Sequence, residues 1–276
     1  MARRLASRLL CILAIAVCAP RASATDKPYD LGILPYLPLT QIHELYGPIA
    51  ADLSAKLGRQ VRLSSKADYS SFREALRRQT YDIGFVQPFD YVDAHDKYGY
   101  LPLARRAELL EAVIVVRPDS PLKAIKDLEG RTIATPPEDA AVSHLTSMAL
   151  RDAGIDPLTG VKRYYGKNHF ACLQSVVIGA ADACGLAEGA LRTIEKERQV
   201  TDRFRILHQT GSIPPPLFVV HGRVARKDRA TILRTILDWP NTEPGRKIIE
   251  RGRFTPFIVA SDAEYEVVRR YLRSRE

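Results

Sequence analysis

The chain has 276 residues, of which 46% are hydrophobic and 26% are charged, with 16 glycines and 18 prolines. This composition is that of an ordinary globular protein, and it excludes intrinsically disordered, collagen-like and coiled-coil chains. The first 24 residues hold four arginines and no acid, so the formal net charge of +9 falls to +5 without them, from 37 basic and 32 acidic residues. Because this excess is small and spread through mixed-sign runs such as 195–198, no nucleic-acid partner is expected.

Residues 1–24 predict an export signal. Three arginines precede an apolar run over 9–19, and small side chains ending at Ala24 offer a signal peptidase its cleavage site. The apolar run has about half of the roughly 20 residues that a membrane-spanning helix needs. The alternatives are a permanent membrane anchor and lipidation at Cys18, which the bulky Val17 disfavours. The mature protein is therefore expected in the periplasm.

The next segment alternates short apolar strands with helices. Strands are expected over 29–34, 61–64 and 82–86, and helices over 39–57, over 69–79 and from 89 onward. Asp68 is expected to cap the second helix, and Pro88 stands where the third helix can begin. Two consecutive βαβ units predict a parallel sheet, with ligand chemistry at the carboxyl ends of its strands.

The same alternation repeats farther along the chain. Strands are expected over 112–117, 132–135, 162–165, 183–186, 204–208 and 217–221, and helices over 123–128, 142–153, 170–178, 227–237, 244–251 and 263–273. We therefore predict an α/β protein with two lobes, the second inserted in the first. Residues 25–106 and 222–276 would form lobe 1 and residues 107–221 lobe 2, with extended crossovers near 104–111 and 217–224.

Two cysteines remain after the signal is removed. Cys172 and Cys184 would reside in an oxidising compartment, where an even number of cysteines predicts a disulfide. The helix over 170–178 should run back against the strand over 183–186, which brings the helix's first turn close to the strand. A pair of buried free thiols and a metal-binding pair are the alternatives, but further metal ligands are not spaced nearby.

The motifs of common enzymes are absent from the sequence. It contains no Gly-x-Ser-x-Gly, no Gly-Lys-Ser/Thr phosphate loop and no His-Glu-x-x-His, and its six histidines are scattered. His169 and Cys172 could imitate a thiol–imidazole pair, but Cys184 is available to oxidise the thiol. We expect a binding protein rather than an enzyme, with no cofactor and no metal.

Three segments of the sequence resemble those of one protein family. They are Gly32-Ile33-Leu34-Pro35-Tyr36, the stretch DIGFVQPFDYV over 82–92, and VVRPDS over 115–120 with DLEG over 127–130. In this order and spacing they resemble the phosphonate-binding periplasmic proteins of ABC transporters, through nearly the whole mature chain. The resemblance implies the type II periplasmic-binding fold, in which two hinged lobes close on a small anion. It implies that the cleft between the lobes holds Tyr36, Tyr91, His169 and Glu188.

The segment over 135–143 departs from the pattern of that family. The family presents a Ser/Thr-rich loop at a helix N-terminus to the phosphonyl oxygens, whereas this segment reads TPPEDAAVS. A helix N-terminus still offers free amides and the positive end of a dipole. Glu138 and Asp139 would then either point away from a bound anion or serve as first-turn acids. Ser143 is the remaining hydroxyl near this loop.

Tyr69 and Gln87 complete the predicted ligand-binding residues. Tyr69 follows the second strand as Tyr36 follows the first, and a tyrosine offers a flat apolar face with a hydroxyl, although ordinary rim packing is the alternative. Gln87 would donate an amide hydrogen bond or cap a turn. We expect the lobes to close on a small solute, a phosphonate or another oxyanion. The partner would be an ABC permease or the periplasmic part of a sensor kinase, and a secreted hydrolase is the alternative class.

Overall fold

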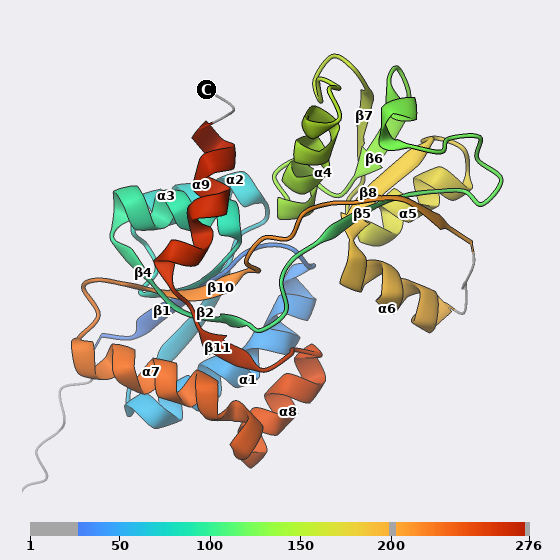
Figure 1. The fold of residues 1–276 in the computed structure, drawn as a ribbon. Coiled ribbons are helices and arrows are strands. Elements are labelled where there is room, and N and C mark those ends of the chain that lie inside the picture. The colour runs from blue at the N-terminus through green and yellow to red at the C-terminus, as the bar shows by residue number, and fades with distance from the viewer. Residues whose placement is uncertain (1–26, 199–202, 274–276) are drawn as a thin grey trace, which may run out of the picture.

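The computed structural model describes residues 27–198 and 203–273 (Figure 1). The predicted signal over 1–24 lies outside the described residues. Two β-sheets, each flanked by helices, form two lobes, and the chain passes from the first lobe to the second and returns. The predicted α/β fold with an inserted second lobe is therefore confirmed.

The sheet of lobe 1 has the order β11-β4-β10-β3-β1-β2. Its strands are β1 (Tyr29–Ile33), β2 (Val61–Ser65), β3 (Ile83–Val86), β4 (Tyr100–Arg106), β10 (Leu217–His221) and β11 (Phe257–Val259). The three strands β1, β2 and β3 are parallel, as the βαβ pattern predicted, whereas β4 and β11 were not expected. Since β10 is antiparallel to both β3 and β4, β4 runs parallel to β3. The carboxyl ends of β1, β2, β3 and β4 therefore lie at one edge of the sheet.

Helices cover both faces of this sheet (Figure 1). One face carries α1 (Leu39–Leu57), α7 (Arg226–Asp238) and α8 (Glu243–Gly252), and the other carries α2 (Tyr69–Arg77), α3 (Pro88–Tyr98) and α9 (Glu266–Arg273). Two short 3-10 turns, η2 (Trp239–Asn241) and η3 (Asp262–Tyr265), precede α8 and α9. The side chain of Asp68 accepts a hydrogen bond from the Ser71 amide at 2.7 Å, which confirms the predicted cap of α2.

The sheet of lobe 2 has the order β7-β6-β8-β5-β9. Its strands are β5 (Ala112–Val116), β6 (Thr132–Thr135), β7 (Lys162–Tyr165), β8 (Ala183–Ala187) and β9 (Arg205–Gln209), and its helical segments are η1 (Ile125–Leu128), α4 (Ala141–Asp152), α5 (His169–Val177) and α6 (Glu188–Arg198). In β5, Val113 and Val115 pack with Cys172 of α5, whereas Ile114 packs with Leu150 of α4. This alternation explains why an almost wholly apolar strand is buried on both faces.

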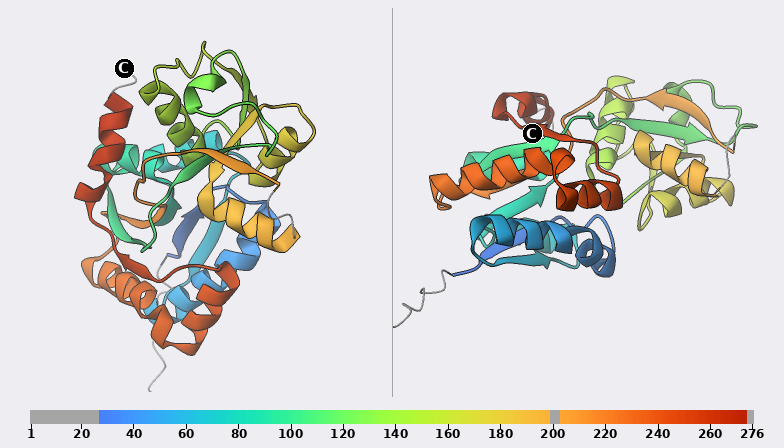
Figure 2. Two further views of the ribbon diagram at one scale, coloured as in Figure 1. Left: turned by 45° about the vertical axis from the view of Figure 1, so that its right-hand side comes forward. Right: turned by 90° about the horizontal axis from the view of Figure 1, so that it is seen from below.

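The predicted boundary between the lobes is wrong on the return side. β10 pairs with β3 and β4, so residues 217–221 belong to the sheet of lobe 1. The two crossovers are joined by an antiparallel bridge between Leu110 and Ile213, and the second crossover therefore lies before residue 217. Figure 2 shows both chain segments running between the lobes. An apolar strand pattern does not reveal which sheet a strand joins, and this produced the error.

The lobes also pack against each other through the beginning of α4. Ala140, Ala141, Val142 and Leu145 belong to the same hydrophobic cluster as the core of lobe 1. The ring of Phe89 in α3 lies 4.4 Å, centroid to centroid, from the ring of His144 in α4. Apolar burial therefore contributes to the contact between lobes.

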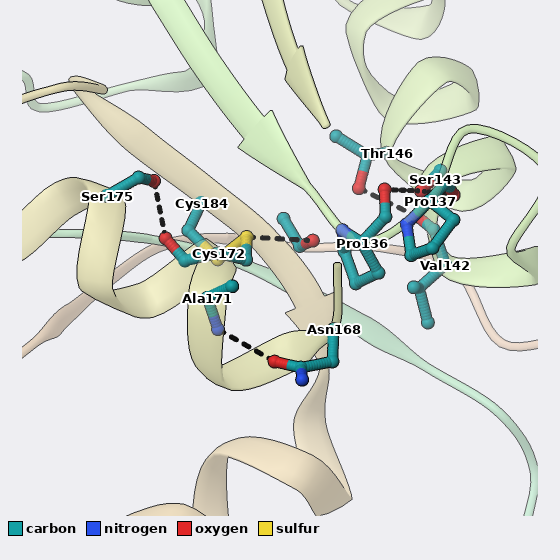
Figure 3. Close-up of a disulfide and its surroundings, with 11 residues drawn as sticks. Pro136, Pro137, Val142, Ser143, Thr146, Asn168, Ala171, Cys172, Ser175 and Cys184 are labelled. Carbon is teal, nitrogen blue, oxygen red and sulfur yellow. Dashed lines mark hydrogen bonds between the residues drawn. A yellow bond between two sulfur atoms is a disulfide. The ribbon is translucent and has the colours of Figure 1, made fainter. Parts of the chain in front are cut away.

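Cys172 and Cys184 form a disulfide between α5 and β8, with their Cα atoms 5.7 Å apart (Figure 3). Both residues are fully buried in the apolar layer between α5 and the sheet. The prediction of a bridge is confirmed, and the alternatives of free thiols and a metal pair are wrong. Within the described residues, no group of three or more His, Cys, Asp or Glu is arranged to hold a metal ion.

Candidate functional site

The predicted site residues follow the carboxyl ends of strands in both lobes. In lobe 1, Tyr36 follows β1 and Gln87 follows β3. In lobe 2, β6, β7 and β8 run parallel, so Thr135, His169 and Glu188 lie at or just beyond one edge of that sheet. Such edges are where open α/β sheets bind ligands. None of the helices in 27–198 and 203–273 combines the length and apolar character that a membrane crossing needs.

Tyr36 presents its ring outward and its hydroxyl inward. The residue is 38% exposed, while its hydroxyl lies 3.0 Å from the hydroxyl of the buried Tyr46. The two rings meet edge to face, with centroids 6.4 Å apart. Burial raises the pKa of both hydroxyls, and the positive charge of Arg106 opposes this rise. Tyr36 is thus an anchored aromatic surface with an arginine beside its hydroxyl.

Gln87 joins the two lobes. Its side-chain Nε2 donates to the carbonyl of Asp139 at 2.7 Å and to Asp90 Oδ2 at 3.0 Å, and its Oε1 accepts the amide of Ala141 at 3.0 Å. The side chain of Gln87 is 2% exposed. It therefore caps α4 from the opposite lobe. Its amide hydrogens are already used, so in this conformation it has none to donate to a ligand.

The two carboxylates of the loop before α4 are engaged by neighbouring elements. Asp139 forms an ion pair with Arg73 of α2, with 2.8 Å between Nη1 and Oδ1. Glu138 lies beside the Tyr165 hydroxyl, where its charge and hydrogen bond add to the burial that raises the tyrosine's pKa. Of the two alternatives, the structure supports carboxylates that turn away from the beginning of α4.

The Ser143 hydroxyl does not face outward from this loop. It donates to the carbonyls of Pro136 at 3.1 Å and Pro137 at 2.9 Å, and the residue is 1% exposed (Figure 3). The hydroxyl therefore holds the loop's own turn together. The loop also contains Thr135, whose Oγ1 is buried without a hydrogen-bond partner among the described residues.

Tyr69 and Tyr91 occupy different environments. Tyr91 is fully buried, donates its hydroxyl to Asp262 at 2.7 Å and packs on Tyr265 with ring centroids 4.5 Å apart. It therefore joins α3 to η3 inside lobe 1 and exposes no surface to a ligand, contrary to the expected role. Tyr69 is almost completely buried, and burial raises the pKa of its hydroxyl, to which the charges of Asp90 in lobe 1 and Asp139 in the loop before α4 add.

His169 and Glu188 begin helices of lobe 2. His169 Nδ1 is buried without a partner among the described residues, and burial lowers the pKa of the imidazole to about 4, so the ring is neutral near pH 7. Glu188 Oε1 accepts from Arg192 Nη1 at 2.7 Å within α6. Its carboxylate is 29% exposed and is already paired with Arg192 in the same helix.

Sequence reasoning missed Arg106 at this edge. Arg106 is the last residue of β4, and its Nε is buried without a hydrogen-bond partner among the described residues. A basic residue at the end of a strand that leaves a lobe was the available signal, but β4 itself was not predicted. The buried polar atoms without a partner near the two edges include Arg106 Nε in lobe 1 and Thr135 Oγ1 and His169 Nδ1 in lobe 2.

Solved structures share this fold. PhnD1 from Prochlorococcus marinus in complex with methylphosphonate aligns with a TM-score of 0.79 and 18% identity, over 90% of this chain and 98% of that chain. A binding protein component of an ABC phosphonate transporter from Pseudomonas aeruginosa aligns with a TM-score of 0.73 and 15% identity, over 88% and 85%. A Xanthomonas citri protein bound to ATP aligns with a TM-score of 0.75 and 17% identity, over 88% and 95%. These likenesses confirm the type II periplasmic-binding fold.

A family model extends the comparison from fold to family. The model matches residues 31–265 and is described as "ABC transporter, phosphonate, periplasmic substrate-binding protein". The match includes all three sequence segments on which the resemblance rested, so that prediction is confirmed. The family consists of substrate-binding transport proteins rather than enzymes. Because the match extends over well more than half of the chain, this protein belongs to the family of phosphonate periplasmic substrate-binding proteins of ABC transporters.

Proposed function

We propose that this protein captures a small phosphonate or related oxyanion between its lobes and presents it to an ABC permease. The observation that carries the proposal is the set of buried polar atoms without partners at the facing strand ends, on Arg106, Thr135 and His169. Buried polar groups are nearly always hydrogen-bonded to protein, water or ligand. A small oxyanion accepts hydrogen bonds from donors of these three kinds.

The proposed site takes five residues from the two lobes. Lobe 1 supplies the exposed ring of Tyr36, the hydroxyl of Tyr69 and the guanidinium of Arg106, and lobe 2 supplies Thr135 and a neutral His169. Gln87, Tyr91 and Ser143 support the site through the lobe contact, the core of lobe 1 and the loop. Closure around the ligand would exclude water and strengthen each polar contact.

The transporter partner follows from the family description, which names an ABC transporter. The sensor-kinase partner and the hydrolase have no comparable support. PhnD1 from Prochlorococcus marinus, whose structure holds methylphosphonate, makes that compound the first ligand to test. The hinge would lie in the paired crossovers at Leu110 and Ile213, since only extended chain joins the sheets there.

Ligand binding is tested by calorimetry and thermal unfolding of the purified mature chain. Methylphosphonate, phosphate, phosphite and sulfate are titrated separately, with a small amine, which is a cation near pH 7, as the control. A ligand that binds only the native state raises the midpoint of unfolding as its concentration rises. Binding of an oxyanion without turnover supports the proposal, and the absence of any shift across the panel contradicts it.

The site itself is tested by His169→Ala, with His43→Ala on the exposed surface of α1 as the matched control. Loss of the His169 donor should weaken oxyanion binding about tenfold, because one hydrogen bond to a charged group contributes about 1.5–3 kcal/mol. The His43 variant should bind like the wild type. If both variants bind the oxyanion with equal affinity, His169 does not contact the ligand and the proposed site is wrong.

Export is proposed to follow cleavage after Ala24. The family is periplasmic, and the basic and apolar segments over 1–24 fit a signal. N-terminal sequencing of the protein recovered from the periplasmic fraction should begin at Thr25. Recovery of the full-length chain from the membrane fraction would favour an anchor instead.

A further inference from the structure

An anion enclosed between the lobes is stabilised by hydrogen-bond donors and by positive charge close to it. A charge moved out of water is stable only when it is paired and hydrogen-bonded. The imidazole of His169 is neutral near pH 7, and the loop before α4 contributes Glu138 and Asp139. Arg73 is already paired with Asp139. A full positive charge beside the anion would therefore come from another residue.

Arg106 lies at the required edge of the sheet. It ends β4, which is parallel to β3, and its backbone pairs with Phe257 of β11. Its neighbour Arg105 bonds to Glu264 of η3 on the side of α9. Consecutive side chains of a strand point to opposite faces, so Arg106 points to the face covered by α1. Its charge accordingly acts on the hydroxyls of Tyr36 and Tyr46.

The guanidinium of Arg106 lacks the carboxylate partners that several other arginines of lobe 1 have. Its Nε is buried and makes no hydrogen bond, and no carboxylate pairs with it among residues 27–198 and 203–273. Arg105, Arg223 and Arg269 are each paired with carboxylates. A buried guanidinium nitrogen without an acceptor is a costly arrangement for a purely structural residue.

We propose that Arg106 is the charge-compensating ligand of the bound oxyanion. Its planar fork can donate two parallel hydrogen bonds to two oxygens of a phosphonate or phosphate group, which a lysine cannot reproduce. Tyr36, anchored on Tyr46, forms the adjacent wall. Arg106 thus selects anions with two oxygens on one centre, and its place at the start of the crossover couples ligand capture to the hinge. This assignment rests on the proposed function.

The test compares three arginine variants by calorimetric titration with methylphosphonate and with phosphate. Arg106→Met removes the charge, Arg106→Lys keeps the charge without the fork, and Arg229→Met is the matched control. Arg229 in α7 also has a half-buried side chain with an unpartnered Nε, but it lies near Asp228, which bonds to Tyr29 at the amino end of β1. Arg106→Met should bind at least about tenfold more weakly, Arg106→Lys should lie between, and Arg229→Met should match the wild type.

The outcomes of this test separate the role of Arg106 from the proposed function. Arg106→Met binding as tightly as the wild type overturns the assignment of Arg106 and leaves the proposed function standing. A wild type that binds neither anion, nor sulfate or phosphite, overturns both. If Arg106→Met fails to fold, the Arg106→Lys variant alone tests the proposal. Wild-type affinity of Arg106→Lys contradicts the bidentate role. A lower affinity supports that role, provided that the ligand-free variant unfolds at the same midpoint as the wild type.

Discussion

Arg73 of α2 and Asp139 of the loop before α4 form an ion pair of 2.8 Å across the boundary between the lobes. Their side chains are 40% and 39% exposed, so the pair contributes at most about 1 kcal/mol. Together with the hydrogen bonds of Gln87 to Asp139 and Ala141, it makes up a set of polar contacts that we call the interlobe clasp. The clasp holds the lobes together on the side of α2 and α3.

Asp139→Asn should weaken ligand affinity by up to about fivefold at low salt. The substitution removes the ion pair and favours lobe opening by the roughly 1 kcal/mol of an exposed pair. Calorimetric titration at two ionic strengths measures the change, which should shrink at high salt. Arg77→Ala is the control, since Arg77 pairs with Glu74 within α2. An affinity that is unaffected at low salt would contradict a role of the pair in closure.

Gln87→Ala should lower the free energy of unfolding by about 1–3 kcal/mol. It leaves the amide of Ala141 and the buried carboxyl of Asp90 without their partner, and an unsatisfied buried group carries that penalty. Urea unfolding measures the loss. The exposed Gln174→Ala in α5 is the control and should change stability by less than about 0.5 kcal/mol. Equal effects of the two substitutions would show that the clasp contributes nothing to stability.

Reduction of the bridge between Cys172 and Cys184 should lower stability by about 2–3 kcal/mol. The bridge joins residues 12 apart, and closing a loop of this length restricts the unfolded chain by about that amount. The midpoint of urea unfolding should fall when reductant is added. In the Cys172→Ala/Cys184→Ala double variant, reductant should have no effect, and a remaining effect would have another cause.

Asp90 should make stability depend on pH. Burial raises its pKa from 3.8 to about 7, while Arg73 and the hydrogen bond from Gln87 oppose the rise. The native state therefore keeps a proton that the unfolded chain loses above pH 4. The stability that this proton contributes is fully present below the pKa of Asp90 in the unfolded chain, and it is lost as the pH rises through about 7.

Asp90→Asn keeps an acceptor for Gln87 and removes the titration. Its stability advantage over the wild type should widen between about pH 5 and 7 and stay constant above that range. Urea unfolding of both proteins across this range measures the difference. The exposed Glu44→Gln serves as the control for the removal of a surface carboxylate. A constant difference between Asp90→Asn and wild type would contradict the raised pKa.

His169 acts in the opposite direction. Burial lowers the pKa of its imidazole from 6.5 to about 4. The imidazole therefore stays neutral in the native state, whereas in the unfolded chain it gains a proton below pH 6.5. The contribution of His169 to the free energy of unfolding is fully present above pH 6.5 and is lost as the pH falls through about 4. His169→Gln should therefore be less acid-sensitive than the wild type between pH 6.5 and 5 in urea unfolding. A steeper loss in the variant would contradict the buried neutral ring.

Local features of the structure could be predicted because they depend on neighbours in the chain. The bounds of α1, β6, β7 and β10 agree with the predicted ranges, since apolar spacing and turn residues are local signals. The cap at Asp68 and the bridge between Cys172 and Cys184 followed from short-range geometry. The family followed from three segments in a fixed order.

The positions of the residues in the proposed site could be predicted only in part. Tyr36, Tyr69 and His169 were placed correctly at strand ends because a βαβ pattern brings those ends to one edge. The environment of a side chain depends on which distant residues face it. The same reasoning therefore selected Tyr91, which donates to Asp262, and omitted Arg106, whose strand was not recognised.

By itself, the sequence determined the alternation of strands and helices, the inserted second lobe, the bridge and the family, because periodicity, spacing and motif order are properties of the chain. Only the tertiary structure decided that β10 joins the first sheet, that Gln87 caps α4 from the other lobe, and that Arg106 keeps an unpartnered nitrogen beside Tyr36. These relationships join residues far apart in the chain. They arise from the packing of whole elements, to which hydrogen bonds and charges then adjust.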